Sequence, residues 1–146
     1  MPEAVMAAEG TVLAFDFGTK RIGVAVGESL IGLAHPLADI RGEEAAPRFA
    51  AIAMVIEEWK PQRLVVGLPL AVDGTPHDLT RRAQRFARQL EGRFGLPVSF
   101  VDERYTSVEA EAGLRAAGAH AALREKRVDS AAAQLILQQF FHENAA

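Results

Sequence analysis

The sequence contains no cysteine among its 146 residues. This excludes both a disulfide framework and a zinc site built on cysteine. No apolar run approaches the roughly 18–20 residues that a membrane-spanning helix needs. Residues 1–10 are small and mildly acidic, without the basic start and apolar stretch of a secretion signal. We therefore expect a cytoplasmic protein with no membrane partner and a flexible N-terminal segment at residues 1–10.

The chain also lacks the net positive charge that many nucleic-acid-binding domains carry. Its formal net charge is −3, which counts weakly against such a function. The basic residues are nevertheless clustered, because residues 81–93 carry five arginines against the single acid Glu91. Local positive patches are therefore available, although each of these arginines can equally belong to a solvated helix face.

What is present is ordinary globular composition, with 49% hydrophobic and 24% charged residues. The first half is typical of β-structure. Residues 11–17 and 21–27 predict two strands joined by a turn, and a third candidate at 30–40 is interrupted at His35-Pro36, which favours an edge strand or a bend. The short connections predict an antiparallel meander.

Helices then alternate with strands. Four apolar residues at steps of three and four predict a helix over residues 43–59, ended by Pro61; they are Phe49, Ile52, Ile56 and Trp59. Residues 63–67 and 98–101 predict short buried strands. A second helix between them has an inward stripe of Leu79, Ala83, Phe86, Leu90 and Phe94.

Two more helices are expected near the C-terminus. The segment Thr106-Ser107-Val108-Glu109 contains a capping box that starts a helix at Ser107. The last helix covers residues 128–142, with Ala132, Ile136 and Phe140 facing inward. This order predicts one α/β domain over residues 11–142: a mixed five-stranded sheet, three strands antiparallel and two added in parallel, with helices on both faces.

Three acids stand out by position. Asp16 ends the first strand between two phenylalanines, where a carboxylate is costly unless it is paired, lies in a cleft or binds a cation. The alternative is a turn aspartate that accepts hydrogen bonds from the Gly18 and Thr19 amides. Glu103 follows the strand at 98–101, and because neighbours alternate, only one acid of the pair Asp102-Glu103 can join Asp16 on a given face.

The alternative for Glu103 is a structural ion pair with Arg104. Asp129 begins the last helix, where a carboxylate also suits the helix dipole.

The three acids could converge at the carboxyl edge of the sheet, where open α/β sheets bind ligands. Oxygen ligands without cysteine suit Mg²⁺ or Mn²⁺. Three carboxylates could hold two such ions about 4 Å apart and support hydrolysis of a phosphodiester.

Four ordered blocks resemble the signature blocks of the YqgF/RuvX family: FDFGTKRIGVAVG, VVGLPLAVDGTPHD, PVSFVDERYTSVEAE and VDSAAAQLILQQFF. The resemblance extends from about Val12 to Phe141. It implies an RNase H-like fold related to the Holliday-junction resolvase RuvC. It also implies catalytic and metal-binding acids at Asp16, Glu103 and Asp129.

The resemblance further implies two sets of binding residues. Lys20 and Arg21 match a basic pair that would approach phosphate, and we add Arg81, Arg85 and Arg104 as residues that would guide or position the strand. A loop would line the cleft with Gly67, Pro69, Asp73, Gly74 and Thr75. The segment between Gly118 and Lys126 is less basic than the family pattern.

Family members are described as nucleases that mature the 5′ end of the 16S ribosomal RNA precursor, or as Holliday-junction resolvases. We expect pre-16S rRNA as the substrate, with a Holliday-junction resolvase acting on DNA as the alternative, because both substrates need metal-bound phosphate and a basic surface. We also expect a pre-ribosomal particle as a partner, and a monomer or homodimer. A non-catalytic RNA- or ribosome-binding module is the alternative from another class. Residues 16–19 also resemble the phosphate-binding hairpin of the actin and sugar-kinase group, but those proteins hold ATP between two such domains.

Overall fold

The computed structural model describes residues 10–71, 73–103 and 130–144. The elements in chain order are β1 (Thr11–Asp16), β2 (Arg21–Glu28), β3 (Leu33–Arg41), α2 (Ala45–Trp59), β4 (Arg63–Leu68), α3 (Asp78–Phe94), β5 (Val98–Asp102) and α6 (Ala131–Glu143). The helix expected from Ser107 lies outside these residues. No described helix is long and apolar enough to cross a membrane.

The five strands form one mixed sheet in the order β3-β2-β1-β4-β5. The first three strands pair antiparallel, and β4 pairs in parallel with both β1 and β5. This confirms the predicted architecture. Pro36 lies in β3 at the edge of the sheet, where a residue without an N–H group is tolerated. β1 is central, and its residues Val12 to Phe15 are all buried.

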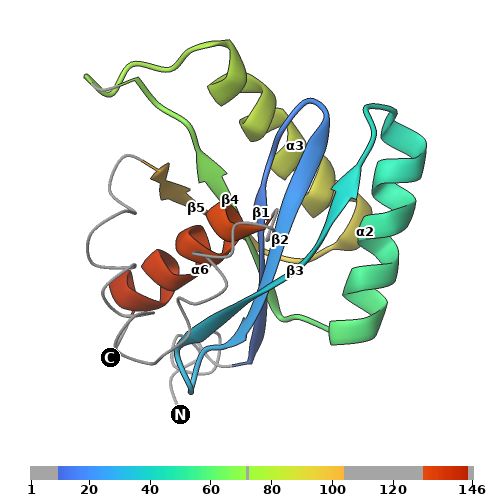
Figure 1. Cartoon of the computed structure of the whole chain (residues 1–146), viewed down its shortest axis with the longest axis vertical. Helices are drawn as coiled ribbons and strands as arrows, with labels where there is room; N and C mark the ends of the chain where they lie inside the picture. Colours follow the sequence, from blue (N-terminus) through green and yellow to red (C-terminus); the bar gives the residue numbers. More distant parts are fainter. Residues whose placement is uncertain (1–9, 72, 104–129, 145–146) are drawn as a thin grey trace.

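Helices cover both faces of the sheet (Figure 1), and each face has its own core. Alternation along β1 sends Leu13 and Phe15 to the face covered by α2 and α3, where Phe49 and Phe86 pack. Val12 and Ala14 face the other way, toward Ile136 and the rest of α6. Asp16 follows this alternation, so its side chain belongs to the α6 face.

The inward face of α6 differs from the predicted one. Ala132 is exposed and Phe140 half-buried, whereas Ala133, Leu137 and Phe141 are buried with Ile136. The reason is that this face also buries glutamines, which hydrophobic periodicity does not register as core. A second expectation was also wrong: Trp59, placed in the core stripe of α2, is 38% exposed because it is the last residue of the helix.

The buried glutamines of α6 serve the edge strand. Gln138 accepts a hydrogen bond from the Ala34 N–H at 3.0 Å and donates one to the Gly32 carbonyl at 2.8 Å. Gln134 donates to the Ala34 carbonyl at 3.0 Å. An edge strand exposes unpaired backbone groups, and these side chains supply the partners that another strand would otherwise provide.

We expect Gln138→Leu to lower the free energy of unfolding by about 2 kcal/mol, because it leaves the buried Ala34 N–H of β3 and the Gly32 carbonyl just before it without these partners. Urea denaturation would measure this. Gln139→Leu is the matched control, since Gln139 is also buried but bonds only the Glu143 carboxylate and keeps an unpartnered Oε1 among the described residues. Equal losses in the two variants would contradict the edge-capping role.

Candidate active site

Asp16 sits at the carboxyl end of β1 between two glycines. It pairs with Gly23 of β2. On the other side, Phe15 pairs with Val66 of β4, so Gly67 is the next residue along that strand. Neither neighbour has a side chain on the α6 face. The two glycines that flank Asp16 therefore leave room that side chains of α6 and Glu103 occupy.

Glu103, directly after β5, uses the space at Gly67. A Cβ atom on Gly67 would lie 3.0 Å from Glu103 Cγ and 2.5 Å from Ile136 Cδ1. The Glu103 side chain therefore lies against the bare backbone of β4, on the Asp16 side of β5. A side chain at position 67 would push Ile136 or Glu103 from its place, so glycine favours this approach.

The two carboxylates influence each other. Burial raises the pKa of Asp16, and Arg21 offsets part of that rise. For Glu103, burial first, then the negative charges of Asp16 and Asp102, raise the pKa to about 7. Proximity of like charges and desolvation both disfavour ionisation, and a bound cation would relieve both. Asp16 and Glu103 thus come together as predicted.

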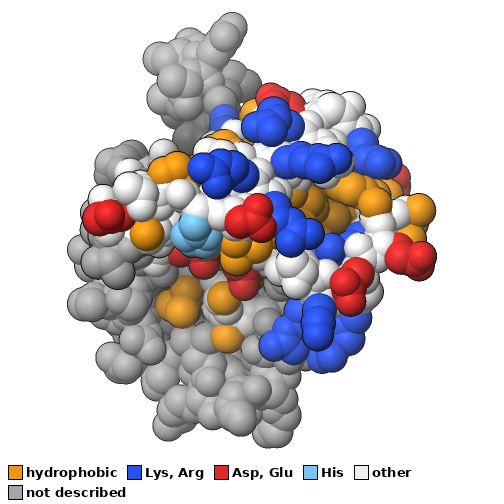
Figure 2. Space-filling model, turned by 90° about the horizontal axis from the view of Figure 1, so that it is seen from above, with side chains coloured by type: hydrophobic (Ala, Val, Ile, Leu, Met, Phe, Trp, Pro, Cys, Tyr) orange, Lys and Arg blue, Asp and Glu red, His pale blue; other side chains and the backbone are white. Residues whose placement is uncertain are grey.

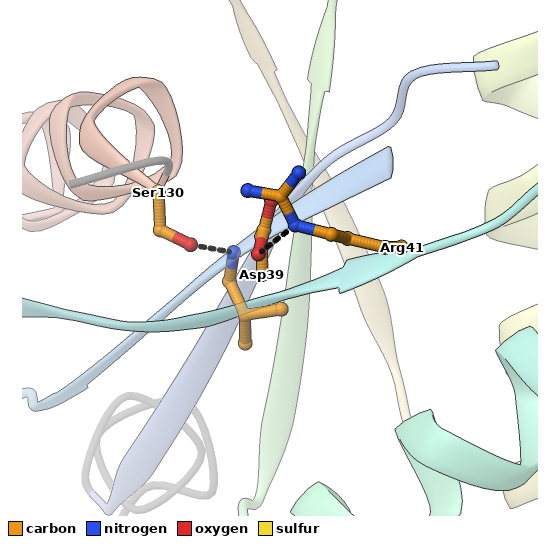
Figure 3. Close-up of polar contacts among 4 residues, drawn as sticks. Asp39, Arg41 and Ser130 are labelled. Carbon is orange, nitrogen blue, oxygen red and sulfur yellow. Dashed lines mark hydrogen bonds and ion pairs between the residues drawn. The ribbon is translucent and has the colours of Figure 1, made fainter. Parts of the chain in front are cut away.

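The start of α6 is fixed beside Asp16. The Ser130 hydroxyl, fully buried, accepts a hydrogen bond from the Val24 N–H at 2.9 Å (Figure 3). A register shift between Ile22 and Val24 breaks the regular pairing of β2 with β3 here. A Cβ on Gly23 would lie 3.4 Å from Asp16 Cβ and 3.5 Å from Ser130 Cα. The first residues of α6 therefore border the Asp16 side of the site.

Two predicted residues, Asp129 and Arg104, lie outside the described residues. Within the described ranges, no three His, Cys, Asp or Glu side chains are grouped so as to hold a metal ion. Asp16 and Glu103 nevertheless fit a hard divalent cation, because they offer only carboxylate oxygens and burial, the main cause of both raised pKa values, disfavours two ionised carboxylates without a nearby cation.

Sequence reasoning missed a further acid on the same face. Asp39 of β3 is paired with Arg41 at 3.4 Å, and its other oxygen, Oδ2, is buried without a hydrogen-bond partner in the described residues. Figure 3 shows this pair beside the contact between Ser130 and Val24. The register shift in β3 orients Asp39, and no local pattern in the sequence predicts that shift.

The predicted basic residues fall on two faces. Arg21 begins β2, where its backbone lies opposite Arg41 of β3. It also acts electrostatically on Asp16, so it lies with the candidate site. Lys20 is exposed in the turn between β1 and β2. Arg81 and Arg85 are exposed on α3, which covers the opposite face, so they are not part of the carboxylate cluster. Figure 2 looks down on the end of the molecule that is at the top of Figure 1, where Lys and Arg side chains lie around acidic ones.

Most of the predicted cleft loop makes its own turn. Asp73 Oδ1 accepts hydrogen bonds from the Thr75 N–H at 3.0 Å and the Thr75 hydroxyl at 2.7 Å. Gly74 has a φ of 91°, which favours glycine. The Pro69 carbonyl accepts a hydrogen bond from the Thr80 hydroxyl in the first turn of α3. These contacts support the loop, whereas Gly67 leaves room for the Glu103 side chain.

Comparisons with known proteins show the family and the fold. The family model described as RuvX, Holliday junction resolvase, matches residues 10–143. A relative from Dechloromonas aromatica (strain RCB), named as a candidate pre-16S rRNA nuclease, is 56% identical over 132 residues, which is 90% of each chain. A relative with the same name from Methylobacillus flagellatus is 53% identical over 141 residues, 97% of each chain.

Among solved structures, RuvC of T. thermophilus in complex with Holliday junction substrate superposes with a TM-score of 0.53. The sequence identity is 16%, and the match covers 92% of this chain and 94% of that chain. At this identity the likeness concerns the fold alone. The RNase H-like fold and the family resemblance expected from the sequence are both confirmed.

The raised pKa of Glu103 predicts a pH dependence of stability. The folded state binds the proton of the Glu103 carboxyl more tightly than the unfolded state does. Protonation of Glu103 therefore stabilises the fold fully below about pH 4.5, and this stabilisation is lost as pH rises through about 7. In EDTA, the unfolding free energy of the wild type should therefore fall across this window. Glu103→Gln should flatten the fall, as measured by urea denaturation at several pH values.

Glu58→Gln, on the exposed surface of α2, controls for the loss of one negative charge. An unchanged pH profile in Glu103→Gln would show that the Glu103 carboxyl is not held in a costly environment.

Proposed function

Because the chain belongs to the RuvX family, we propose that it is a nuclease that hydrolyses phosphodiester bonds in nucleic acid, with the 5′ end of precursor 16S rRNA as its substrate. The observation that carries this proposal is the burial of Asp16 and Glu103 together at the carboxyl edge of the sheet. Buried like charges are destabilising for the fold alone, and they are typical of sites that bind and use a cation. The names of the relatives support RNA as the substrate.

We assign Mg²⁺ or Mn²⁺ as the cofactor, held by Asp16 and Glu103. Asp129 would be the third ligand, and its support is its place in the sequence directly before Ser130, which borders the Asp16 side of the site. A divalent cation bound by these acids supplies Lewis acidity, which activates water and stabilises charge on the leaving oxygen.

The chain's own basic residues would position the substrate. Arg21 lies close enough to Asp16 to lower its pKa, so a phosphate held by Arg21 would be near the carboxylates. Lys20, exposed and one residue before Arg21, would contact the neighbouring part of the substrate's sugar-phosphate backbone. Arg81 and Arg85, on the other face, would attract the strand over a longer range.

Resolution of a four-way DNA junction is the second candidate, and the description of the matching family favours it. Symmetric cutting of a junction needs two active sites related by a two-fold axis. A homodimer that cuts junctions and leaves RNA intact would support this candidate, whereas RNA cleavage by a monomer would support the first. A pre-ribosomal particle as the true substrate would be shown by faster cleavage in particles than in naked RNA.

We expect Asp16→Asn to fold like the wild type and to lose at least about 10²-fold in cleavage rate, because ion binding stabilises the transition state by several kcal/mol. The assay compares a short RNA spanning the precursor 5′ junction with a synthetic four-way DNA junction, in Mg²⁺, Mn²⁺ or EDTA. Glu91→Gln, on the exposed surface of α3, is the charge-matched control.

Metal-dependent RNA cleavage that Asp16→Asn abolishes would support the ribonuclease. Cleavage by this variant at the wild-type rate would show that the acid assignment is wrong. Binding of RNA without cleavage of either substrate would favour a non-catalytic RNA-binding module.

A further inference from the structure

A buried arginine lies under the turn between β1 and β2. Arg48 is in the first turn of α2 and only 8% exposed. A buried charge is costly unless it is well partnered, yet no carboxylate of the described residues forms an ion pair with it. Its partners are backbone carbonyls instead: it donates from Nη1 to Thr19 O at 3.4 Å and from Nη2 to Gly18 O. The guanidinium also lies 5.2 Å from the Phe17 ring centre.

These contacts orient the peptide units of the turn. The carbonyls of Gly18 and Thr19 point to Arg48, and the next carbonyl, that of Lys20, accepts a hydrogen bond from the Gly42 N–H at 2.9 Å. In a planar trans peptide the N–H points opposite to the C=O. The N–H groups of Thr19 and Lys20 therefore point away from Arg48, toward the exposed side of the turn.

The electrostatic setting of Arg48 favours an anion nearby. Burial lowers the pKa of its guanidinium, Arg82 of α3 lowers it further, and Glu43 offsets only part of this. Arg48 also sits near the N-terminus of a helix, where the helix dipole disfavours a cation. A guanidinium remains protonated in proteins, so two positive charges persist close to a turn that presents N–H groups outward. Outward-facing backbone N–H groups with such neighbours attract anionic oxygens.

We propose that Arg48 is a positioning residue for the nucleic-acid backbone: it holds the β1–β2 turn so that the Thr19 and Lys20 N–H groups and the Lys20 ammonium face a phosphate of the bound strand. This inference depends on the nucleic-acid binding in the proposed function, but it does not depend on cleavage. Arg48 contacts the turn and not the substrate.

The test measures binding without catalysis. Fluorescence anisotropy in EDTA gives the Kd of a labelled single-stranded RNA for wild type, Arg48→Met, Arg48→Lys and Arg93→Met. Arg93 is the matched control, because its guanidinium also packs on a phenylalanine, 4.0 Å from the Phe49 ring centre, but it lies in the last turn of α3. We expect Kd to rise about tenfold in Arg48→Met, the worth of one charge-assisted hydrogen bond, and less than about twofold in Arg93→Met.

A second readout separates positioning from mere stability. Titration of the wild type with the same RNA should shift the NMR signals of the Thr19 and Lys20 amides. In Arg48→Met these shifts should be lost while the remaining spectrum stays that of a folded protein. Arg48→Lys should bind with intermediate affinity, since lysine keeps the charge but cannot present the two planar donors of a guanidinium.

Wild-type Kd and wild-type amide shifts in Arg48→Met would overturn the proposal. If Arg48→Met does not fold, Arg48→Lys decides. Wild-type affinity in Arg48→Lys would show that RNA binding does not need the two hydrogen bonds from the guanidinium to the turn, and it would overturn the proposal. Failure of the wild type itself to bind RNA would overturn both this inference and the proposed function. Binding that depends on Arg48, in a protein that cuts neither RNA nor a DNA junction, would overturn the nuclease and leave the positioning role standing.

Discussion

The rest of the site depends on one unfavourable interaction, the burial of two carboxylates close enough to raise the pKa of Glu103 to about 7. Side chains on the flanking strands would either fill the space beside the two carboxylates or clash with its neighbours. Positions 23 and 67 are glycines, which have no side chain there. The hydrogen bond from Val24 to Ser130 then fixes the start of α6 against the same space. The buried acids have no evident value for stability alone, and the glycines together with this hydrogen bond keep the two acids near each other.

The hairpin of β1 and β2 connects the two faces of the sheet. Asp16 ends β1 on the α6 face, whereas the turn that follows is held from the α2 face by Arg48. The carboxylate is set by strand pairing with Gly23, and the turn is set by a side chain from a helix. The proposed catalytic and backbone-binding roles therefore depend on different contacts, although Asp16 and Lys20 are only a few residues apart.

The sequence was sufficient for features that depend on short-range patterns. Strand alternation, turn residues and strand ends placed Asp16 and Glu103 at one edge, and the structure brings them together. The contact between Ser130 and Val24 was not predictable, because it needs a register shift and joins residues 106 positions apart. Arg48 was missed for a related reason. Its partners are backbone carbonyls, which every residue has, so no residue type in the sequence indicates the contact. Buried glutamines hid the true inner face of α6 because they look polar in sequence.

A net charge of −3 does not prevent this protein from binding a polyanion. At physiological ionic strength, charges more than about 8 Å away are largely screened at the surface, so a phosphate responds mainly to its nearest groups. Near the β1–β2 turn these include Lys20 and Arg21, with Arg48 buried beneath where screening is weaker. Among the acids at this end, Asp16 and Glu103 are more buried than the exposed Lys20 and Arg21, and burial raises both pKa values. The exposed Glu43 acts on Arg48, but it offsets only part of the effects of burial and of Arg82 on that guanidinium. The strand would therefore meet a positive local surface on an acidic molecule, and the charge that repels it would be reduced where cleavage is proposed to occur.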